Sequence, residues 1–105
     1  SPMFRGILST IYVDIEKNVS QLKILKMLNI FYKKENFVKI LKADSLISTN
    51  DVINSNNCHI SVCKSKYSNK MIILCAIDNL IKGGAGQAVQ NLNNKFNFPE
   101  STGLK

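Results

Sequence analysis

The sequence predicts a single α+β domain in which helices pack on a mainly antiparallel β-sheet. Two patterns carry this prediction. Over four short segments, apolar residues either alternate with polar ones or run without a break, which is typical of strands. Over two longer segments they recur at intervals of three and four residues, which is typical of amphipathic helices. The length of 105 residues, 45% of them hydrophobic and 20% charged, suits one globular domain.

The first half of the chain predicts a strand, a helix and a second strand. Alternating apolar residues indicate a strand over residues 5–15. Asn18 and Ser20 are candidate N-caps for a helix over residues 21–34. The expected apolar stripe of this helix consists of Ile24, Leu25, Met27, Leu28 and Phe31. A second short strand is expected over residues 37–41.

The second half predicts a hairpin followed by a helix. Residues 42–57 are polar and form a long connection, and two strands follow over 58–66 and 70–77, joined through Ser68-Asn69. Both faces of the later strand are apolar, which predicts a central strand buried on both sides. A glycine cluster, Gly83, Gly84 and Gly86, then opens a last helix to about Phe96. Its apolar stripe consists of Ala85, Ala88, Val89, Leu92 and Phe96.

The positive charge does not predict a nucleic-acid partner. The chain has 14 Lys and Arg residues against 7 Asp and Glu, a net charge of +7. Arg5 is the one arginine, although arginine is the residue that binds phosphates and bases with a bidentate fork. The lysines are also scattered along the chain. Nucleic-acid binding therefore stays a third hypothesis, behind the two given below.

No membrane segment is expected. The longest apolar run, Met71 to Ile77, is far shorter than the ~20 residues that a bilayer requires. Asp14 and Glu16 interrupt the apolar N-terminal stretch, so we expect no signal peptide. We therefore expect a cytoplasmic protein.

The three cysteines predict neither a disulfide framework nor a metal site. Cys58 and Cys63 are five residues apart and would face opposite sides of one strand, and Cys75 lies on the next. The single histidine, His59, offers no set of zinc ligands with usable spacing. We expect structural thiols in a reducing compartment and no metal.

The glycine cluster resembles a phosphate-binding loop only superficially. Glycine-rich turns at helix starts can bind anions through free N–H groups. Here Val89 stands where the dinucleotide fingerprint needs a third Gly or Ala, and no βαβ unit surrounds the cluster. A stand-alone Rossmann site is therefore excluded. From the pattern alone, tight turning and close helix packing are the favoured explanation of the glycines.

The last third of the chain carries a specific motif. Residues 78–104 have the sequence DNLIKGGAGQAVQNLNNKFNFPESTGL. This stretch closely resembles the C-terminal signature of the N-acetyl-gamma-glutamyl-phosphate reductase family, within the semialdehyde dehydrogenase group. The usual form there is DNLVKGAAGQAVQNMN, followed by FGLPETTGL. Four earlier segments also resemble the family: residues 2–8 (family form P-M-x-R-G-I-L), 31–32 (F-Y), 37–38 (F-V) and 52–56 (V-x-G-S-N). The resemblance therefore spans nearly the whole chain.

A few positions depart from the family pattern. Asn54 replaces a glycine, so we expect a different local turn. Gly84 stands where Ala or Ser is usual, which would loosen the helix start. Asn97 and Phe98 replace Gly-Leu before Pro99, a change confined to surface packing.

The resemblance implies a larger enzyme. The family has a longer chain with an N-terminal NADP-binding Rossmann domain, a nucleophilic Cys in G-C-Y-P-T and a general-base His. None of these motifs occurs here. We therefore expect residues 1–105 to be one fragment of the catalytic and dimerisation domain. Its fold would be part of a glyceraldehyde-3-phosphate-dehydrogenase-like C-terminal domain, without catalytic residues of its own.

The resemblance also implies a reaction and supporting contacts. The reaction is NADPH-dependent reduction of N-acetylglutamyl 5-phosphate to the semialdehyde, with release of phosphate, in arginine biosynthesis. The cofactor-binding residues implied are Asn79, Gly83, Gly86 and Gln87. Arg5 is the implied ligand of the substrate's phosphate or carboxylate. Structural alternatives remain open: a cap or turn for Asn79, packing for the other three, and an ion pair for Arg5.

Two hypotheses of different classes follow. The first is an enzyme fragment, inactive alone and not expected to bind NADP tightly. Its partners would be the missing N-terminal domain, a second copy of the chain in a homo-oligomer, and a small acyl-phosphate substrate. The second is a free-standing dimerisation or regulatory module that keeps the fold and lacks the chemistry.

Overall fold

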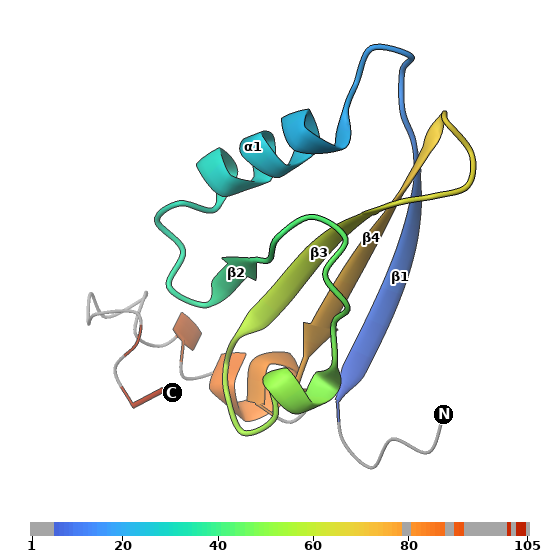
Figure 1. Ribbon diagram of the computed structural model, residues 1–105. Helices are drawn as coiled ribbons and strands as arrows, with labels where there is room; N and C mark the ends of the chain where they lie inside the picture. Colours follow the sequence, from blue (N-terminus) through green and yellow to red (C-terminus); the bar gives the residue numbers. More distant parts are fainter. Residues whose placement is uncertain (1–5, 79–80, 88–89, 92–100, 102, 105) are drawn as a thin grey trace.

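In the described part of the chain, the fold is a four-stranded sheet with one long helix packed against it (Figure 1). The computed structural model describes residues 6–78, 81–87, 90–91, 101 and 103–104. The elements are β1 (Ile7–Asp14), α1 (Gln21–Phe31), β2 (Val38–Ile40), η1 (Thr49–Asp51), β3 (Cys58–Lys64), β4 (Lys70–Ile77) and η2 (Ile81–Ala85). No helix in this part of the chain is long and apolar enough to cross a membrane.

The sheet is mixed, with the order β1-β4-β3-β2. β4 pairs antiparallel with both β1 and β3, and β2 runs parallel to β3. The predicted α+β class and the central position of β4 are therefore confirmed. In β4, Met71 and Ala76 lie on opposite faces and both are buried, which agrees with the apolar character of both faces.

The strand β1 lies at an edge of the sheet and remains largely uncovered within the described residues. Its pairing puts Ile7 and Ile11 on one face and Leu8 and Tyr12 on the other. All four side chains are exposed, Tyr12 to 69%. The reason is that α1 packs near the opposite edge of the sheet, against β2 and β3 (Figure 1).

The helix α1 begins where the sequence predicted and ends three residues earlier. The hydroxyl Oγ of Ser20 accepts a hydrogen bond from the backbone N–H of Lys23 at 3.1 Å, so Ser20 is the N-cap. Leu25 is buried against Val62 and Met71. The prediction that Phe31 belongs to the buried stripe is wrong, because its side chain is 77% exposed at the helix end.

A buried amide joins the start of α1 to the sheet. The side chain Nε2 of Gln21 donates to the carbonyl oxygen of Val62 at 2.8 Å and to Oδ1 of Asp44 at 2.9 Å. The same Oδ1 accepts from the backbone N–H of Lys64 at 2.9 Å. Asp44 has φ of 60°, a left-handed conformation that aspartate tolerates better than most residues. The helix, the connection after β2 and the strand β3 therefore meet at one polar cluster.

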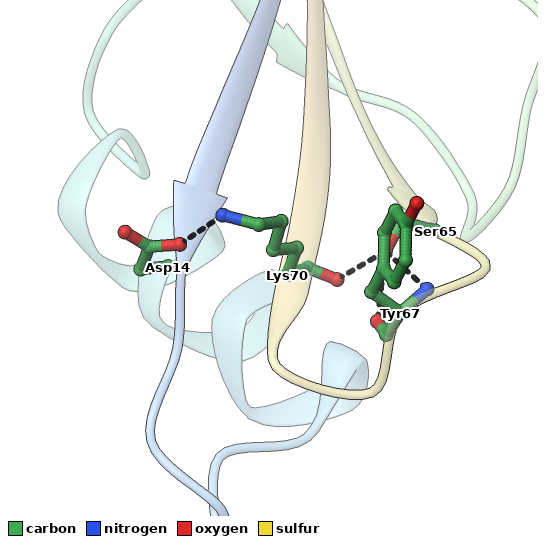
Figure 2. A network of polar contacts seen from close by, with 4 residues as sticks. All are labelled: Asp14, Ser65, Tyr67 and Lys70. Carbon is green, nitrogen blue, oxygen red and sulfur yellow. Dashed lines mark hydrogen bonds and ion pairs between the residues drawn. The ribbon is translucent and has the colours of Figure 1, made fainter.

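The hairpin between β3 and β4 is closed by Ser65 (Figure 2). Its hydroxyl accepts from the backbone N–H of Tyr67 at 3.1 Å and lies 2.8 Å from the carbonyl oxygen of Lys70. The ammonium of Lys70 pairs with Oδ1 of Asp14 at the end of β1. Because both side chains are exposed, this ion pair contributes about 0–1 kcal/mol and mainly marks the register of β1 on β4.

We expect Gln21→Ala to lower the free energy of unfolding by about 1–3 kcal/mol, because one buried and one partly buried hydrogen bond are lost. Urea denaturation measures the change. The neighbouring variant Leu22→Ala is the control, since Leu22 is 74% exposed and its truncation should change stability by about 0.5 kcal/mol or less. Equal effects of the two substitutions would contradict the role given to Gln21.

The pKa of Asp44 is lowered, first by the hydrogen bond from the Lys64 backbone and then by that from Gln21. Its ionised form therefore stabilises the fold above the unfolded-state pKa, and this contribution is lost as the pH falls through the folded-state pKa.

We expect Asp44→Asn to be less stable than the wild type near neutral pH and to approach it as the pH falls to about 3. Urea midpoints across this range provide the measurement. Asparagine keeps the oxygen acceptor and the left-handed backbone, so the comparison isolates the charge. A constant difference at every pH would contradict the assignment.

Candidate functional site

The candidate site lies where β4 ends and the chain turns into η2, beside the segment 54–56 (Figure 1). Most of the residues singled out in the sequence as cofactor-binding fall in this region. Two predicted residues, Arg5 and Asn79, lie outside the described residues.

Asp78 organises the turn. Its side chain is fully buried, Oδ2 accepts from the backbone N–H of Asn54 at 2.8 Å, and Oδ1 accepts from the backbone N–H of Ile81 at 3.3 Å. Acceptance from the N–H three residues later is the geometry of a helix N-cap. The helical segment therefore begins before the glycines, as η2 (Ile81–Ala85), and continues through residues 86–87.

Helical structure thus starts two residues before the predicted glycine cluster, as the irregular η2, whereas the α-helical residues start at Gly86, the last glycine of that cluster. Gly83 and Gly84 lie inside η2, and Gly84 interrupts it with a non-helical backbone at φ −147° and ψ −112°. The sequence suggested a loosened helix start at Gly84, and a kink is found there. Residues 90–91 are helical, and the expected continuation over 92–96 lies outside the described residues.

Asn54 has φ of 63°, which is the left-handed region. Glycine adopts this region without cost, and asparagine is among the side chains that tolerate it. The conformation explains why an asparagine can stand here in place of the glycine of the resembling family. The N–H of this residue is the one that binds Asp78.

A buried amide pair connects the helical segment to the connection before β3. Nδ2 of Asn56 donates to Oε1 of Gln90 at 2.8 Å, and Nζ of Lys82 donates to the same oxygen at 2.7 Å. The ammonium of Lys82 also lies 5.6 Å from the ring centroid of Phe37. Lys82 therefore serves as a hydrogen-bond partner inside the fold.

Gly86 is buried because the chain approaches it closely. A Cβ at this position would lie 2.4 Å from Cγ2 of Ile81 and 2.6 Å from both the carbonyl oxygen of Ile81 and Oδ1 of Asn56. That amide oxygen is buried and has no hydrogen-bond partner in the described part of the chain. The packing interpretation of the glycine cluster is supported at this position.

The remaining groups near the turn are more accessible. Gln87 is half-buried, and its Nε2 donates to Oδ1 of Asn91 at 3.0 Å. Gly84 and Ala85 are exposed. A cavity of about 320 Å³ opens beside the turn, lined in the described residues by Asn54, Ile81, Gly103 and Leu104. This volume is at the lower end of the range for small-molecule sites.

Metal ligands do not gather in the described residues, where no group of three or more His, Cys, Asp and Glu side chains occurs. His59 has a buried Nε2 without a partner there, and burial followed by the charge of Lys39 lowers its pKa. The three cysteines are free thiols. As predicted, Cys58 and Cys63 lie on opposite faces of β3.

The structure thus brings Gly86 together with three residues that the sequence analysis did not assign to the site: Asp78, Asn56 and Gln90. The signal for Asp78 was an acidic residue between a strand and a helical pattern, which is typical of an N-cap. Asn56 and Gln90 lie in the segments 52–56 and 78–104 that resemble the family, but nothing in the sequence pointed to their contact, which spans 34 residues of chain.

Residues 1–79 match the family model described as semialdehyde dehydrogenase, dimerisation domain. The match covers well over half of the chain, and the chain therefore belongs to this family.

Within the family, the chain is similar to N-acetyl-gamma-glutamyl-phosphate reductases. It is 45% identical over 104 residues to that of Thermoanaerobacter pseudethanolicus and 48% identical over 104 residues to that of Desulforamulus reducens. Each alignment covers 99% of this chain and 30% of the relative. The probable chloroplastic reductase of Arabidopsis thaliana is 44% identical over 98% of this chain and 26% of its own length. The chain therefore spans about 30% of the length of these relatives.

We expect Gly86→Ala to destabilise the protein by about 1–3 kcal/mol, because a Cβ would overlap both side-chain and backbone atoms. Thermal or urea unfolding measures the loss. Ala85→Ser, at the exposed neighbouring position, is the matched control and should leave stability within about 0.5 kcal/mol. A Gly86→Ala variant as stable as the wild type would show that Ile81 and Asn56 do not pack as described.

Proposed function

We propose that this chain is the C-terminal part of an NADP-dependent reductase that converts N-acetylglutamyl 5-phosphate to N-acetylglutamate 5-semialdehyde and phosphate in arginine biosynthesis. The similarity to reductases of that name across 99% of the chain is the observation that carries the proposal. Since the chain spans 30% of these relatives, the nucleotide-binding domain and the catalytic Cys and His would be contributed by the rest of the enzyme.

The turn after β4 would supply supporting contacts to the cofactor. Bound NADPH supplies the hydride for the reduction. Half-buried Gln87 carries an amide that can both donate to and accept from a carboxamide. We assign Asn79, Gly83 and Gln87 to this contact. Gly86 would contribute indirectly, through the close helix packing that its missing Cβ permits.

Arg5 would bind the phosphate or the carboxylate of the substrate. Its planar guanidinium can hold either group with two parallel hydrogen bonds. In the sequence, residue 5 comes two positions before the first residue of β1.

The exposed strand β1 supports assembly with a second copy of the chain. Ile7, Leu8, Ile11 and Tyr12 are 42–69% exposed, which is a large apolar area for one strand. The family to which the chain belongs is described as a dimerisation domain. We propose that β1 contributes to a homo-oligomer interface of the enzyme.

The full-length enzyme that carries this chain should oxidise NADPH when N-acetylglutamyl 5-phosphate is added, whereas the 105 residues alone should show no turnover. NADPH absorbance measures both. If instead the natural chain starts near Met3 and shows no turnover, the free-standing dimerisation or regulatory module is favoured.

In the full-length enzyme, Asn79→Ala should raise the KM for NADPH about tenfold with a smaller change in kcat, because a hydrogen bond to the cofactor is lost. Asn18→Ala is the control, since Asn18 is exposed and follows the end of β1 that pairs with the start of β4, away from the turn after β4. Unchanged kinetics for Asn79→Ala would remove this residue from the cofactor site.

A further inference from the structure

Cys58 and Cys75 form a thiol pair that the proposed function does not use. The sulfur atoms lie 3.3 Å apart, one on β3 and one on β4. Both side chains are half-buried, and neither belongs to the cluster that packs under α1 around Leu25. The third thiol, Cys63, lies on the opposite face of the sheet, near Ser61 and the carbonyl oxygen of Ser45.

We propose that Cys58 and Cys75 are a site of reversible oxidation by hydroperoxides, in which Cys75 is the attacking thiol and Cys58 resolves the product to a cross-strand disulfide. The proposal concerns residues outside the turn after β4 and does not depend on the reductase activity.

The steps balance as follows. The Cys75 thiolate attacks one oxygen of hydrogen peroxide, the O–O bond breaks, and the second oxygen leaves as hydroxide, which takes up a proton to become water. The Cys75 sulfur is then a sulfenic acid. The Cys58 sulfur attacks the Cys75 sulfur, an S–S bond forms, the S–O bond breaks, and the departing hydroxide takes the Cys58 proton. Two thiols and one peroxide thus give one disulfide and two waters.

The pKa values of the two thiols shift in opposite directions, which indicates the attacking and the resolving thiol. The hydrogen bond shared with Cys58 lowers the pKa of Cys75 to about 7. The shared proton, followed by burial, raises the pKa of Cys58, and the ammonium of Lys82 on η2 acts weakly in the opposite direction. Near neutral pH, Cys75 therefore has far more thiolate than an ordinary cysteine, and the thiolate is the reactive form.

The strand register makes the expected disulfide a reducible one. Cys58 lies opposite Ile77, and Cys75 lies opposite Ile60, so the cysteines are diagonal neighbours. Diagonal residues are farther apart than the Cβ separation of about 3.8 Å that a disulfide prefers. Bond formation must close the sulfur gap from 3.3 Å to about 2.05 Å and draws the strands out of their register. A strained disulfide is more easily reduced, so we expect a dithiol at rest and rapid reversal by thiols.

The test treats the full-length protein with hydrogen peroxide and maps its cysteines by peptide mass spectrometry. We expect an intramolecular link between Cys58 and Cys75 that dithiothreitol removes. Cys63→Ser is the matched control and should form the same link at the same rate. This variant also removes ambiguity, because Cys58 and Cys63 share a tryptic peptide.

The single variants separate the two roles. Cys58→Ser should accumulate a sulfenic acid on Cys75 that dimedone traps. Cys75→Ser should form no link, and its Cys58 should oxidise about tenfold more slowly than Cys75 does in the wild type, since its thiolate fraction is lower. The wild-type rate should rise with pH around a midpoint of about 7.

A second measurement needs no oxidation. Phenylarsine oxide bridges two thiols held close together, so it should bind the wild type and Cys63→Ser but neither Cys58→Ser nor Cys75→Ser. Thermal unfolding shows whether each variant is folded. The proposal is overturned if the three cysteines oxidise at equal rates, if links form only between molecules, or if Cys75 proceeds to sulfinic acid without a link to Cys58.

Discussion

The pairing of β4 between β1 and β3 is the constraint on which the rest of the structure depends. β4 comes late in the chain and must hydrogen-bond along its length to β1, which begins 63 residues before it, as well as to its hairpin neighbour. A shift of one residue would exchange the two faces of the strand. Met71 would then leave the core under α1, and Ala76 would leave the opposite face, where it is fully buried. The apolar character of both faces thus fixes the register.

The same register positions the candidate site. Because β4 ends at Ile77, the next residue, Asp78, lies directly after the end of this central strand and caps the following helical turn. Its second oxygen holds the N–H of Asn54, so one buried carboxylate joins two segments that are distant in the chain. Gly86 then permits Ile81 and Asn56 to approach, and Gln90 completes the contact. The turn is thus shaped by four buried residues: Asp78, Asn56, Gly86 and Gln90. Among the described residues of the turn, Gly84 and Ala85 are exposed and Gln87 is half-buried.

β4 also carries Cys75, one thiol of the pair, just before this turn. Cys75 lies three residues before Asp78 and faces Cys58, which begins β3. An oxidation that draws these two strands together would act on the strand that positions the turn. The thiol pair and the turn are therefore connected through β4, although the proposed oxidation does not involve the residues of the turn.

The sequence by itself determined the four strands and the helix α1, the central place of β4, two candidate N-caps that include Ser20, and the family motif over residues 78–104. These follow from local periodicity, capping chemistry and motif spacing, which involve neighbours in the chain. Only the tertiary structure decided that Phe31 is exposed, that β2 runs parallel to β3, and that the helical segment begins before the glycines. It also decided the partners of Asn56, Lys82 and Cys75, because each contact joins side chains from different elements. Such contacts depend on how the elements pack in three dimensions, which no local pattern specifies.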